Sequence, residues 1–324
     1  MDASLIKILD RFSKLRILVL GDVMLDKYIW GKVSRISPEA PVQIVLVENE
    51  TYAPGGAANV ANNVAELGGL VTIIGVRGDD SAGQLLVKEL RRRSIVTDNL
   101  LTDPSRPTIQ KVRLIAHSQQ LIRFDYEKYD KFSDSLVKSI NNAIEANIKN
   151  VDCLVISDYA KGFIDDRVMR CVLDNAAKYK KSIIIDPRPK NKHLYKNATV
   201  ICPNFSEACA MTGMEPENEE SFELLGQTLL QMMNSNIVIT RGEKGMSIFN
   251  KDGAVMHIPT KAREVYDVTG AGDTAVATLA LALSAGATLE EAAIIANYAA
   301  GVVVGKVGTS TVTVGEIRDS LQHE

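Results

Sequence analysis

Short runs of apolar and β-branched residues recur along the chain, and most of them are separated by stretches with a helical pattern. These runs are Leu15–Leu20, Leu70–Val76, Cys153–Ile156, Ser182–Ile185, Thr199–Cys202, Ile237–Thr240 and Met246–Phe249. Continuous apolar strands are typical of a parallel sheet that helices cover on both faces. The pattern therefore predicts a doubly wound α/β fold with a mostly parallel sheet, formed by a single domain over residues 1–324.

Polar residues follow several of these predicted strands. The positions are Gly21-Asp22, Ser157-Asp158, Asp186, Asn204 and Arg241-Gly242. Ligands of open α/β sheets bind beyond the carboxyl ends of the strands. One aspartate at a strand end is ordinary turn chemistry, but several together exceed what turns alone require. We therefore expect a functional site along this edge of the sheet.

Two stretches of the chain interrupt the alternation of strands and helices. One is Val42–Glu48, and the other is the pair Thr108–Ala116 and Gln120–Tyr126. They are typical of antiparallel strands in which charges stand among aliphatic residues. They predict a small antiparallel β lid formed by insertions at about 31–54 and 105–127. Such a sheet can cover the active site and can also form the contact of a homodimer.

The composition is that of an ordinary soluble globular protein. Hydrophobic residues make up 46% of the chain, charged residues 24%, and the formal net charge is −3. The triplet Arg91–Arg93 ends a helix predicted over Ala82–Arg93, where cations favour the helix dipole, so we expect no nucleic-acid partner. The four cysteines lack CxxC spacing, and no apolar stretch reaches membrane-spanning length. These features predict a reduced, cytoplasmic protein without a membrane partner.

The segment Asp267–Thr274 is the most specific chemical signal in the chain. It reads Asp-Val-Thr-Gly-Ala-Gly-Asp-Thr and leads directly into an apolar helical run, Ala275–Ala285. Small residues let successive backbone amides point at one anion, and the positive end of the following helix adds to that field. The carboxylate of Asp273 would stand where a substrate hydroxyl loses its proton. The alternative is that Asp273 only caps the helix.

The same loop also fits a relaxed dinucleotide pattern, G-x-G-x-x-A, over Gly270–Ala275. That fingerprint belongs at the first strand-to-helix turn of a βαβ unit, and the preceding Lys261–Tyr266 is too polar for a buried strand. Glu290 and Glu291 lie near the spacing of a ribose-binding acid, but they follow a helix. A dinucleotide-dependent oxidoreductase is therefore the weaker alternative.

A glycine pair opens another predicted helix near the N-terminus. Gly55 and Gly56 stand before a helix that runs to about Leu67, with Asn59 one turn in. Close backbone approach at the glycines, together with the amide of Asn59, would suit a hydroxyl-rich ligand. Taken alone, the pair is better explained by a tight turn.

Together, these segments resemble the ribokinase-like (PfkB-type) carbohydrate kinases. The resemblance is carried by Gly55-Gly56 with Asn59 and by Asp267-x-Thr-Gly-Ala-Gly-Asp273, in the family's order and separation. It implies that ATP is the phosphoryl donor and that Asp273 is the base that activates a sugar hydroxyl. It also implies an anion hole for the transferred phosphoryl group, formed by the backbone of Gly270, Ala271 and Gly272.

The resemblance assigns further residues to the nucleotide and to cations. The segment Asn204-Phe205-Ser206-Glu207 looks like the family's N-x-x-E motif, which orders Mg²⁺ and the nucleotide phosphates, with Glu207 acting through water. Adenosine would be bordered by Thr240, Arg241, Gly242 and the helix that carries Asn297. A monovalent cation such as K⁺ would be framed by Asp267, Thr269 and Gly308.

The resemblance also places the sugar. Asp22 and Asp26 would bond sugar hydroxyls, beside Asn59 and the backbone of Gly55 and Gly56. For Asp26 the alternative is an ordinary helix or turn residue.

A narrower resemblance is to the branch of this family that phosphorylates D-glycero-β-D-manno-heptose 7-phosphate at its anomeric carbon, a step toward the lipopolysaccharide inner core. It rests on residues 21–26, 34–42, 118–123, 157–162 and 301–309. A phosphorylated substrate requires fixed cations, and the candidates are Arg35, Lys111, Arg123 and Lys161. Each of them is alternatively a salt-bridge residue of the surface or the lid. Lys161 is the first choice because it follows a strand-end aspartate.

Two alternatives remain beside this substrate. One is a kinase of the same family that acts on another sugar or sugar phosphate, and the other is a sugar-binding regulator without catalysis. The cationic lid residues favour a phosphorylated substrate, and the intact Asp273 with its glycine loop favours catalysis.

Overall fold

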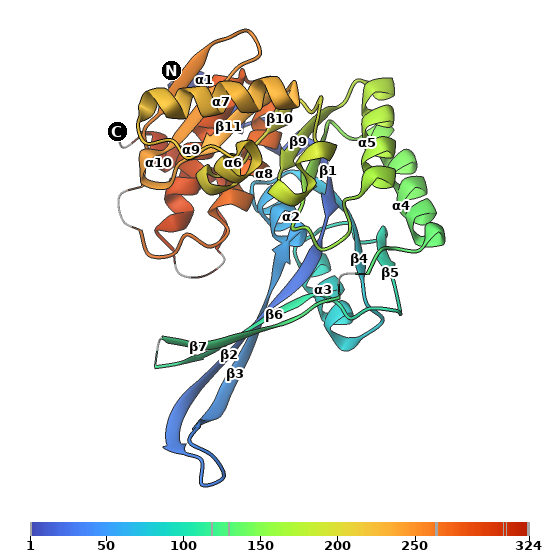
Figure 1. Cartoon of the computed structure of the whole chain (residues 1–324), viewed down its shortest axis with the longest axis vertical. Helices are drawn as coiled ribbons and strands as arrows, with labels where there is room; N and C mark the ends of the chain where they lie inside the picture. The colour runs from blue at the N-terminus through green and yellow to red at the C-terminus, as the bar shows by residue number, and fades with distance from the viewer. Residues whose placement is uncertain are drawn as a thin grey trace.

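In the computed structural model, a large sheet with helices on both faces carries a smaller sheet that projects from it (Figure 1). The structure describes residues 2–117, 119–128, 130–262, 265–306, 308 and 310–322. Both ends of the predicted 1–324 range therefore lie outside the described residues. So do Ser118, Val307 and Thr309 of the motif segments, and Arg263 and Glu264 of the polar stretch before the glycine loop.

Within the described residues, nine strands form the large sheet in the order β13-β12-β11-β10-β9-β8-β1-β4-β5. They are β1 (Arg16–Gly21), β4 (Leu70–Arg77), β5 (Leu100–Thr102), β8 (Cys153–Ser157), β9 (Ser182–Asp186), β10 (Val200–Ile201), β11 (Asn236–Thr240), β12 (Met246–Phe249) and β13 (Val255–Ile258). The pairings from β5 to β11 are all parallel. Every apolar run predicted above is a strand of this sheet, which confirms the α/β class.

The edge formed by β12 and β13 is antiparallel. The chain between Thr240 and Met246 is too short for the crossover that a parallel neighbour requires, so β12 turns back beside β11. β13 follows a turn at Asp252-Gly253 and is not among the strands predicted from the sequence.

Helices cover both faces because neighbouring residues of each strand point to opposite sides. In β1, Ile17 and Val19 are buried in one core, and Leu18 and Leu20 in the other. The first core packs against α1 (Asp2–Leu9), α2 (Ala57–Glu66), α3 (Ser81–Arg92), α8 (Ala271–Ser284), α9 (Leu289–Val304) and α10 (Val314–Gln322). The second packs against α4 (Asp134–Asn147), α5 (Asp166–Tyr179), α6 (Phe205–Thr212) and α7 (Glu219–Met233). No helix in the described part of the chain is long and apolar enough to cross a membrane.

The smaller sheet, called the lid below, projects from the body formed by the large sheet and its helices (Figure 1). Its strands are β2 (Val23–Ile36), β3 (Gln43–Gly56), β6 (Gln110–Ala116) and β7 (Gln119–Tyr126), in the order β3-β2-β6-β7. The pairs β2–β3 and β6–β7 are antiparallel, the second of them as predicted, whereas β2 and β6 run parallel.

The predicted limits of the lid need one correction. The lid begins at Val23, ahead of the predicted boundary near residue 31. Charged residues such as Asp26 and Lys27 interrupt the apolar residues of β2, so no continuous apolar run marks it as a strand.

The order of the strands places a crevice beside β1. From β1, one part of the chain continues to β4 and β5, and a later part adds β8 to β11 on the other side. Such a switch point is where open α/β sheets bind ligands. Asp22 follows β1 there, and Asp158 and Tyr159 follow β8.

Candidate active site

The carboxyl ends of the strands border a cavity of about 110 Å³. Its lining includes Tyr159, Asp186, Arg188, Asn204, Glu207, Thr240, Gly270, Gly272 and Asp273. The structure thus brings the predicted base, two glycines of the predicted anion hole and three predicted nucleotide residues to one cavity. Tyr159, Asp186 and Arg188 line the same cavity without having been assigned a role from the sequence.

Asp273 lies in the first turn of α8 and is 6% exposed. Its Oδ2 accepts a hydrogen bond from Asn59 Nδ2 at 2.7 Å, and its Oδ1 accepts one from the Tyr159 hydroxyl at 3.0 Å. The N-cap of α8 is Gly270, so the alternative in which Asp273 only caps the helix is wrong. Burial raises the pKa of Asp273 to about 6, while the hydrogen bonds from Asn59 and Tyr159 act in the opposite direction.

The loop before α8 has the geometry of an anion site. Gly270 has a φ of 85°, a left-handed conformation that glycine adopts without strain. The first-turn amides of a helix lack partners within the helix, and its dipole favours an anion there. The amide of Ala271 donates to Val268 O at 3.3 Å, which makes Ala271 the least available of the three predicted donors. No described atom lies within 4 Å of where a Cβ of Gly272 would stand, so the space above the loop is open.

The predicted N-x-x-E segment begins α6 with a capping box. Asn204 Oδ1 accepts from the Glu207 amide and Glu207 Oε2 accepts from the Asn204 amide, both at 2.9 Å. Phe205 and Ser206 lie on the exposed first turn between them. Arg188 donates to the other oxygen of Glu207. One end of the Glu207 carboxylate therefore supports the helix, and the other faces the cavity beside a guanidinium group.

Asp186 adds a further acidic group to the cavity. Burial raises its pKa, and the nearby carboxylates of Asp273 and Glu207 raise it further. Arg188 is the cation that these carboxylates share, because it is attracted to Glu207, Asp186 and Asp273. Its guanidinium also lies 4.6 Å from the centre of the Tyr159 ring.

The predicted sugar residues occupy the junction of body and lid. Asp26 is 5% exposed and accepts a 2.6 Å hydrogen bond from Arg113. A Cβ on Gly55 would stand 2.6 Å from Asp26 Oδ2, so only glycine allows this close approach. Gly56 is the N-cap of α2, which carries Asn59. Asn59 Oδ1 is buried and has no hydrogen-bond partner among the described residues.

Asp22 is placed differently from the other sugar candidates. Its carboxylate accepts hydrogen bonds from the amides of Tyr159, Lys161 and Phe163, each at 3.0 Å. Burial raises its pKa to about 6, and the charge of Asp158 adds to this effect. Asp22 therefore fixes the loop after β8, and its predicted contact with a sugar hydroxyl stays a prediction.

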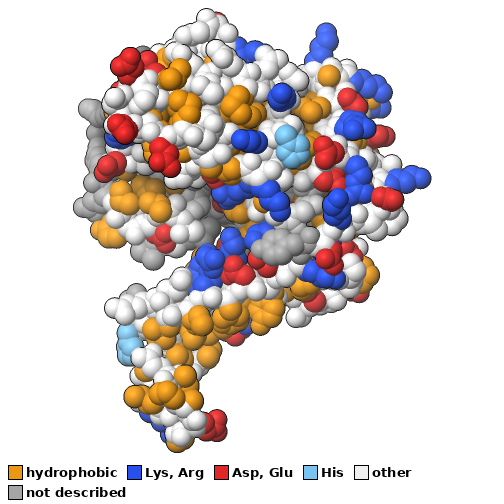
Figure 2. All heavy atoms as spheres, in the orientation of Figure 1, with side chains coloured by type: hydrophobic (Ala, Val, Ile, Leu, Met, Phe, Trp, Pro, Cys, Tyr) orange, Lys and Arg blue, Asp and Glu red, His pale blue; other side chains and the backbone are white. Residues whose placement is uncertain are grey.

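Of the predicted phosphate-binding cations, Lys111 and Arg123 lie on the face of the lid that is turned toward the cavity. Lys111 pairs in register with Asp26, and its Nζ lies 5.3 Å from the centre of the Tyr159 ring. Arg113 and Arg123 stand directly opposite each other on β6 and β7. Lysine and arginine side chains gather where the lid meets the body (Figure 2).

The structure does not bring Arg35 to this cluster. Arg35 is exposed near the far end of β2, on the order of 30 Å beyond Asp26 at the usual rise per residue of a strand. Its prediction as a phosphate ligand of the same site is therefore wrong for a single chain. Lys161 forms a 2.6 Å ion pair with Glu127 and lines a separate cavity of about 10 Å³ with Asp22.

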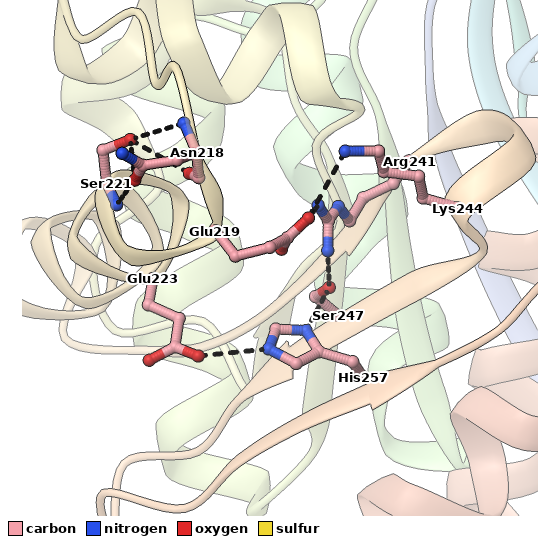
Figure 3. A network of polar contacts seen from close by, with 8 residues as sticks. All are labelled: Asn218, Glu219, Ser221, Glu223, Arg241, Lys244, Ser247 and His257. Carbon is pink, nitrogen blue, oxygen red and sulfur yellow. Dashed lines mark hydrogen bonds and ion pairs between the residues drawn. The ribbon is translucent and has the colours of Figure 1, made fainter.

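The nucleotide-binding candidates separate into two groups. Thr240 lines the cavity and bridges to Asn204. Arg241 does not line it, because its guanidinium bonds Glu219 at 2.6 and 2.8 Å and Ser247 at 3.3 Å (Figure 3). Gly242 opens a short 3₁₀ helix, and Asn297 Nδ2 donates to Pro259 O at 2.7 Å. The Arg241 side chain thus supports the β11–β12 turn, which leaves its backbone and Gly242 as the groups that could border a nucleotide.

The residues predicted around a monovalent cation are joined by hydrogen bonds. The amides of Thr269 and Gly308 donate to Asp267 at 2.9 and 3.2 Å. Although burial acts in the other direction, these bonds lower the pKa of Asp267. In the described part of the chain, His, Cys, Asp and Glu form no group of three or more that could hold a metal ion.

Sequence comparison identifies the class of protein that carries this site. Residues 14–314 match the model of the pfkB family of carbohydrate kinases. The bifunctional protein HldE of Trichlorobacter lovleyi is 42% identical over 327 residues, which cover 100% of this chain. The chain spans 63–67% of the length of the HldE proteins that it matches.

Solved structures agree on the fold. Ribokinase from Arabidopsis thaliana, complexed with ribose and ATP, has a TM-score of 0.73 at 20% identity, over 95% of this chain and 98% of that one. Phosphofructokinase-2 from Escherichia coli in complex with potassium has a TM-score of 0.77 at 18% identity, with coverage of 95% and 98%. These likenesses concern the fold alone, whereas the family match covers most of the sequence. The chain belongs to the pfkB family of carbohydrate kinases.

Proposed function

We propose that this protein transfers the γ-phosphoryl group of ATP to the anomeric hydroxyl of D-glycero-β-D-manno-heptose 7-phosphate. The products are heptose 1,7-bisphosphate and ADP, and the reaction would supply ADP-heptose for the lipopolysaccharide core. The observation that carries the proposal is the placement of two features at the junction of body and lid. A buried Asp273 lies at an anion-binding loop on one side, and a cationic face of the lid lies on the other. The sequence identity of 42% to an HldE protein, which covers the whole chain, supports the choice of heptose 7-phosphate as the substrate.

In the proposed reaction, Asp273 is the base. The sugar hydroxyl gives its proton to the Asp273 carboxylate while its oxygen forms a bond to the γ-phosphorus. The bond between that phosphorus and the β,γ-bridging oxygen breaks, and ADP leaves with the bond's electron pair. Asp273 then releases the proton to solvent. Asn59 Nδ2 holds one oxygen of the carboxylate, and the unpaired Asn59 Oδ1 is available to accept from a sugar hydroxyl.

The negative charge of the transferred group would meet the amides at the start of α8 and the guanidinium of Arg188. Preorganised donors of this kind contribute most when charge develops in the transition state. Arg188 already lies among the carboxylates of the cavity. The Arg188 guanidinium would therefore contact the transferred phosphoryl group without a large movement.

Glu207 and Asp267 are the residues that would serve cations. Glu207 faces the cavity with one oxygen and would hold Mg²⁺ through water. Bound Mg²⁺ would neutralise charge on the nucleotide phosphates. Asp267, with Thr269 and Gly308, would hold K⁺ behind the anion loop. The hydrogen bonds that the Asp267 carboxylate accepts favour its ionised form.

The far phosphate of the substrate would be held by the lid. Arg113 and Arg123 are direct cross-strand partners, and like charges in such positions destabilise a sheet. Burial lowers the pKa of Lys111; the charges of Asp26 and Asp125 act in the opposite direction, and those of Arg113 and Arg123 lower it further. A bound phosphate would relieve this repulsion. Lys111, Arg113 and Arg123 are preferred over Lys161 because they stand together on one face of the lid. Ion pairing does not distinguish them, since Arg113 pairs with Asp26 and Arg123 with Asp125, as Lys161 does with Glu127.

The whole chain would act as one kinase domain in a cytoplasmic homodimer. The lid face opposite the cations exposes Ile122, Phe124 and Tyr126, which are 53%, 40% and 49% exposed. Apolar surface of this kind marks an interaction site, and the same face on a second copy would be self-complementary.

The test is ADP release from Mg-ATP with heptose 7-phosphate, compared with ribose, fructose 6-phosphate and sedoheptulose 7-phosphate. We expect turnover with the heptose phosphate to exceed that with the other sugars. Preferred turnover of another sugar would retain the kinase mechanism and discard the heptose assignment. An absence of turnover with all four, in protein that binds ATP, would contradict the proposed reaction.

A further inference from the structure

Tyr159 connects the proposed base to both halves of the site. Its hydroxyl donates to Asp273 Oδ1 at 3.0 Å, while Asn59 Nδ2 donates to Oδ2 at 2.7 Å. Each oxygen of the carboxylate is thus held by one donor, and the two donors come from α2 and from the loop after β8. The orientation of the Asp273 carboxylate is therefore set by two side chains.

The ring of Tyr159 contacts a cation of the lid and a cation of the body. Lys111 Nζ lies 5.3 Å from the ring centre, and Arg188 Cζ lies 4.6 Å from it. Both distances fall within the range of cation–π attraction. The position of the ring is thus linked to the lid, which would hold the sugar phosphate, and to the region that would receive the γ-phosphoryl group.

The loop that carries Tyr159 is held in a strained conformation. Ala160 has a φ of 55°, in the left-handed region that residues with a Cβ rarely adopt. The Ala160 amide donates to Asp158 at 2.6 Å, and Asp22 accepts from the amides of Tyr159, Lys161 and Phe163. Such strain persists where the surroundings over-determine it, and it clusters at functional sites. Two buried carboxylates therefore fix the backbone at Tyr159 and in the residues that follow it.

We propose that Tyr159 is a positioning residue for the phosphoryl transfer: its hydroxyl orients the Asp273 carboxylate toward the substrate hydroxyl, and Asp22 and Asp158 act by holding its loop. The inference rests on the proposed function, because it assigns Tyr159 a role through the proposed base. It also gives Asp22 a role that does not require contact with the sugar.

The hydrogen bond has a consequence for the titration of Asp273. A donor to a carboxylate favours the ionised form and lowers its pKa, so removal of the Tyr159 hydroxyl raises it. The charged groups around Asp273 and Tyr159 remain in place in such a variant. They are Asp26 on β2, Lys111 on β6, Asp186 at the end of β9, Arg188 after β9 and Glu207 on α6. Any shift between wild type and variant then reports the lost hydroxyl.

The first experiment measures kcat/KM against pH for wild type and Tyr159→Phe. The acid limb of the wild-type profile is expected near pH 6, and the variant limb should move upward by about one pH unit. Tyr52→Phe is the matched control, because the Tyr52 hydroxyl also donates to a carboxylate, that of Glu50, at 2.6 Å on the lid. Its acid limb should coincide with that of the wild type.

A second variant strengthens the same hydrogen bond and should shift the pKa of Asp273 in the opposite direction. 3-Fluorotyrosine at position 159 preserves the size of the side chain and is a stronger donor, because fluorine makes the phenol more acidic. Its acid limb should move to lower pH than that of the wild type. Since 3-fluorotyrosine keeps both the hydroxyl and the ring, this variant provides a test even if Tyr159→Phe does not fold.

A readout without turnover separates this inference from the proposed function. Carboxyl ¹³C NMR of the nucleotide-free protein, with the Asp273 signal identified by its absence in Asp273→Asn, gives the titration midpoint directly. The midpoint should rise in Tyr159→Phe and fall with 3-fluorotyrosine. Midpoints and acid limbs that stay at the wild-type values in both variants overturn the inference. A wild-type protein that phosphorylates no sugar but shows these shifts would refute the proposed function and leave the Tyr159–Asp273 link intact.

Discussion

The body and the lid differ in how their apolar residues are covered. In the body, helices pack on both faces of the sheet, so that Ile17 and Leu18 are 0% exposed. In the lid, one face carries charges toward the cavity, and the other leaves Ile122 and Phe124 at 53% and 40% exposed. The body therefore completes its core within one chain, while the lid leaves apolar side chains exposed on one of its faces.

This difference separates the tasks of the two regions. The proposed transfer chemistry depends on Asp273 and Arg188, which the body holds in place without a ligand. Recognition of the substrate phosphate and of a second subunit would depend on the lid. The two regions meet at Tyr159, which contacts Asp273, Arg188 and Lys111. Variants in one region should consequently leave the properties of the other unchanged.

The largest effect is expected from Asp273→Asn in the body. Loss of the base should lower kcat by roughly 10²–10⁴. Sugar-phosphate affinity, measured by calorimetry, should stay close to that of the wild type because the lid is untouched. Full activity in a variant with a native circular dichroism spectrum would exclude Asp273 as the base.

Arg188→Met should have the next largest effect. Removal of a cation that stabilises the transferred group should lower kcat by about 10²–10³. Arg167→Met is the control, because Arg167 also pairs with carboxylates and its side chain is 38% exposed, against 33% for Arg188. The measurement is the steady-state kcat of the two variants. Equal values would show that Arg188 does not stabilise the transferred group.

The lid is tested separately by Phe124→Glu. A charge on its apolar face should weaken the dimer by at least about tenfold, since ionised groups are costly to bury at an interface. Sedimentation velocity across protein concentrations measures the change. Leu224→Glu, at a position on α7 that is 56% exposed, should leave the assembly as it is in the wild type. A monomeric wild type would contradict the proposed role of this face.

The smallest effect is the pH dependence of the wild type. Burial raises the pKa of Asp273 to about 6, and the proposed base acts only when it is ionised. The value of kcat/KM should therefore be level above pH 6 and fall about tenfold per pH unit below it. A profile that stays level down to pH 4.5 would show that the base has an ordinary carboxylate pKa.

The sequence predicted the body better than the lid because the two regions leave different patterns. Strands buried on both faces are continuous apolar runs, so β1, β8 and β9 could be read directly. β2 was not predicted because charged residues interrupt its apolar residues on both faces: Asp26 and Lys27 are neighbours and therefore point to opposite sides. The hairpin to β13 had a signal in Asp252-Gly253, which favours tight turns between strands.

The site divides in the same way. The proximity of Asp273 to the glycine loop was predictable because they lie within eight consecutive residues. Tyr159 and Arg188 come from loops after different strands, and their proximity depends on the strand order, which local motifs do not encode. Arg35 was assigned to the wrong place because a sequence motif does not tell how far apart its residues lie in space. Arg35 and Asp26 belong to one extended strand, which separates them widely.

The most direct test of the division between body and lid compares heptose 7-phosphate with the same heptose without its phosphate, in wild type and Arg123→Met. Lys32→Met, which removes a lid cation paired with Glu48 at 2.6 Å, is the control. We predict that Arg123→Met lowers kcat/KM for the phosphorylated sugar by about tenfold or more and leaves kcat/KM for the unphosphorylated sugar unchanged. An equal loss with both sugars, or none with either, would contradict the claim that the lid reads the substrate phosphate.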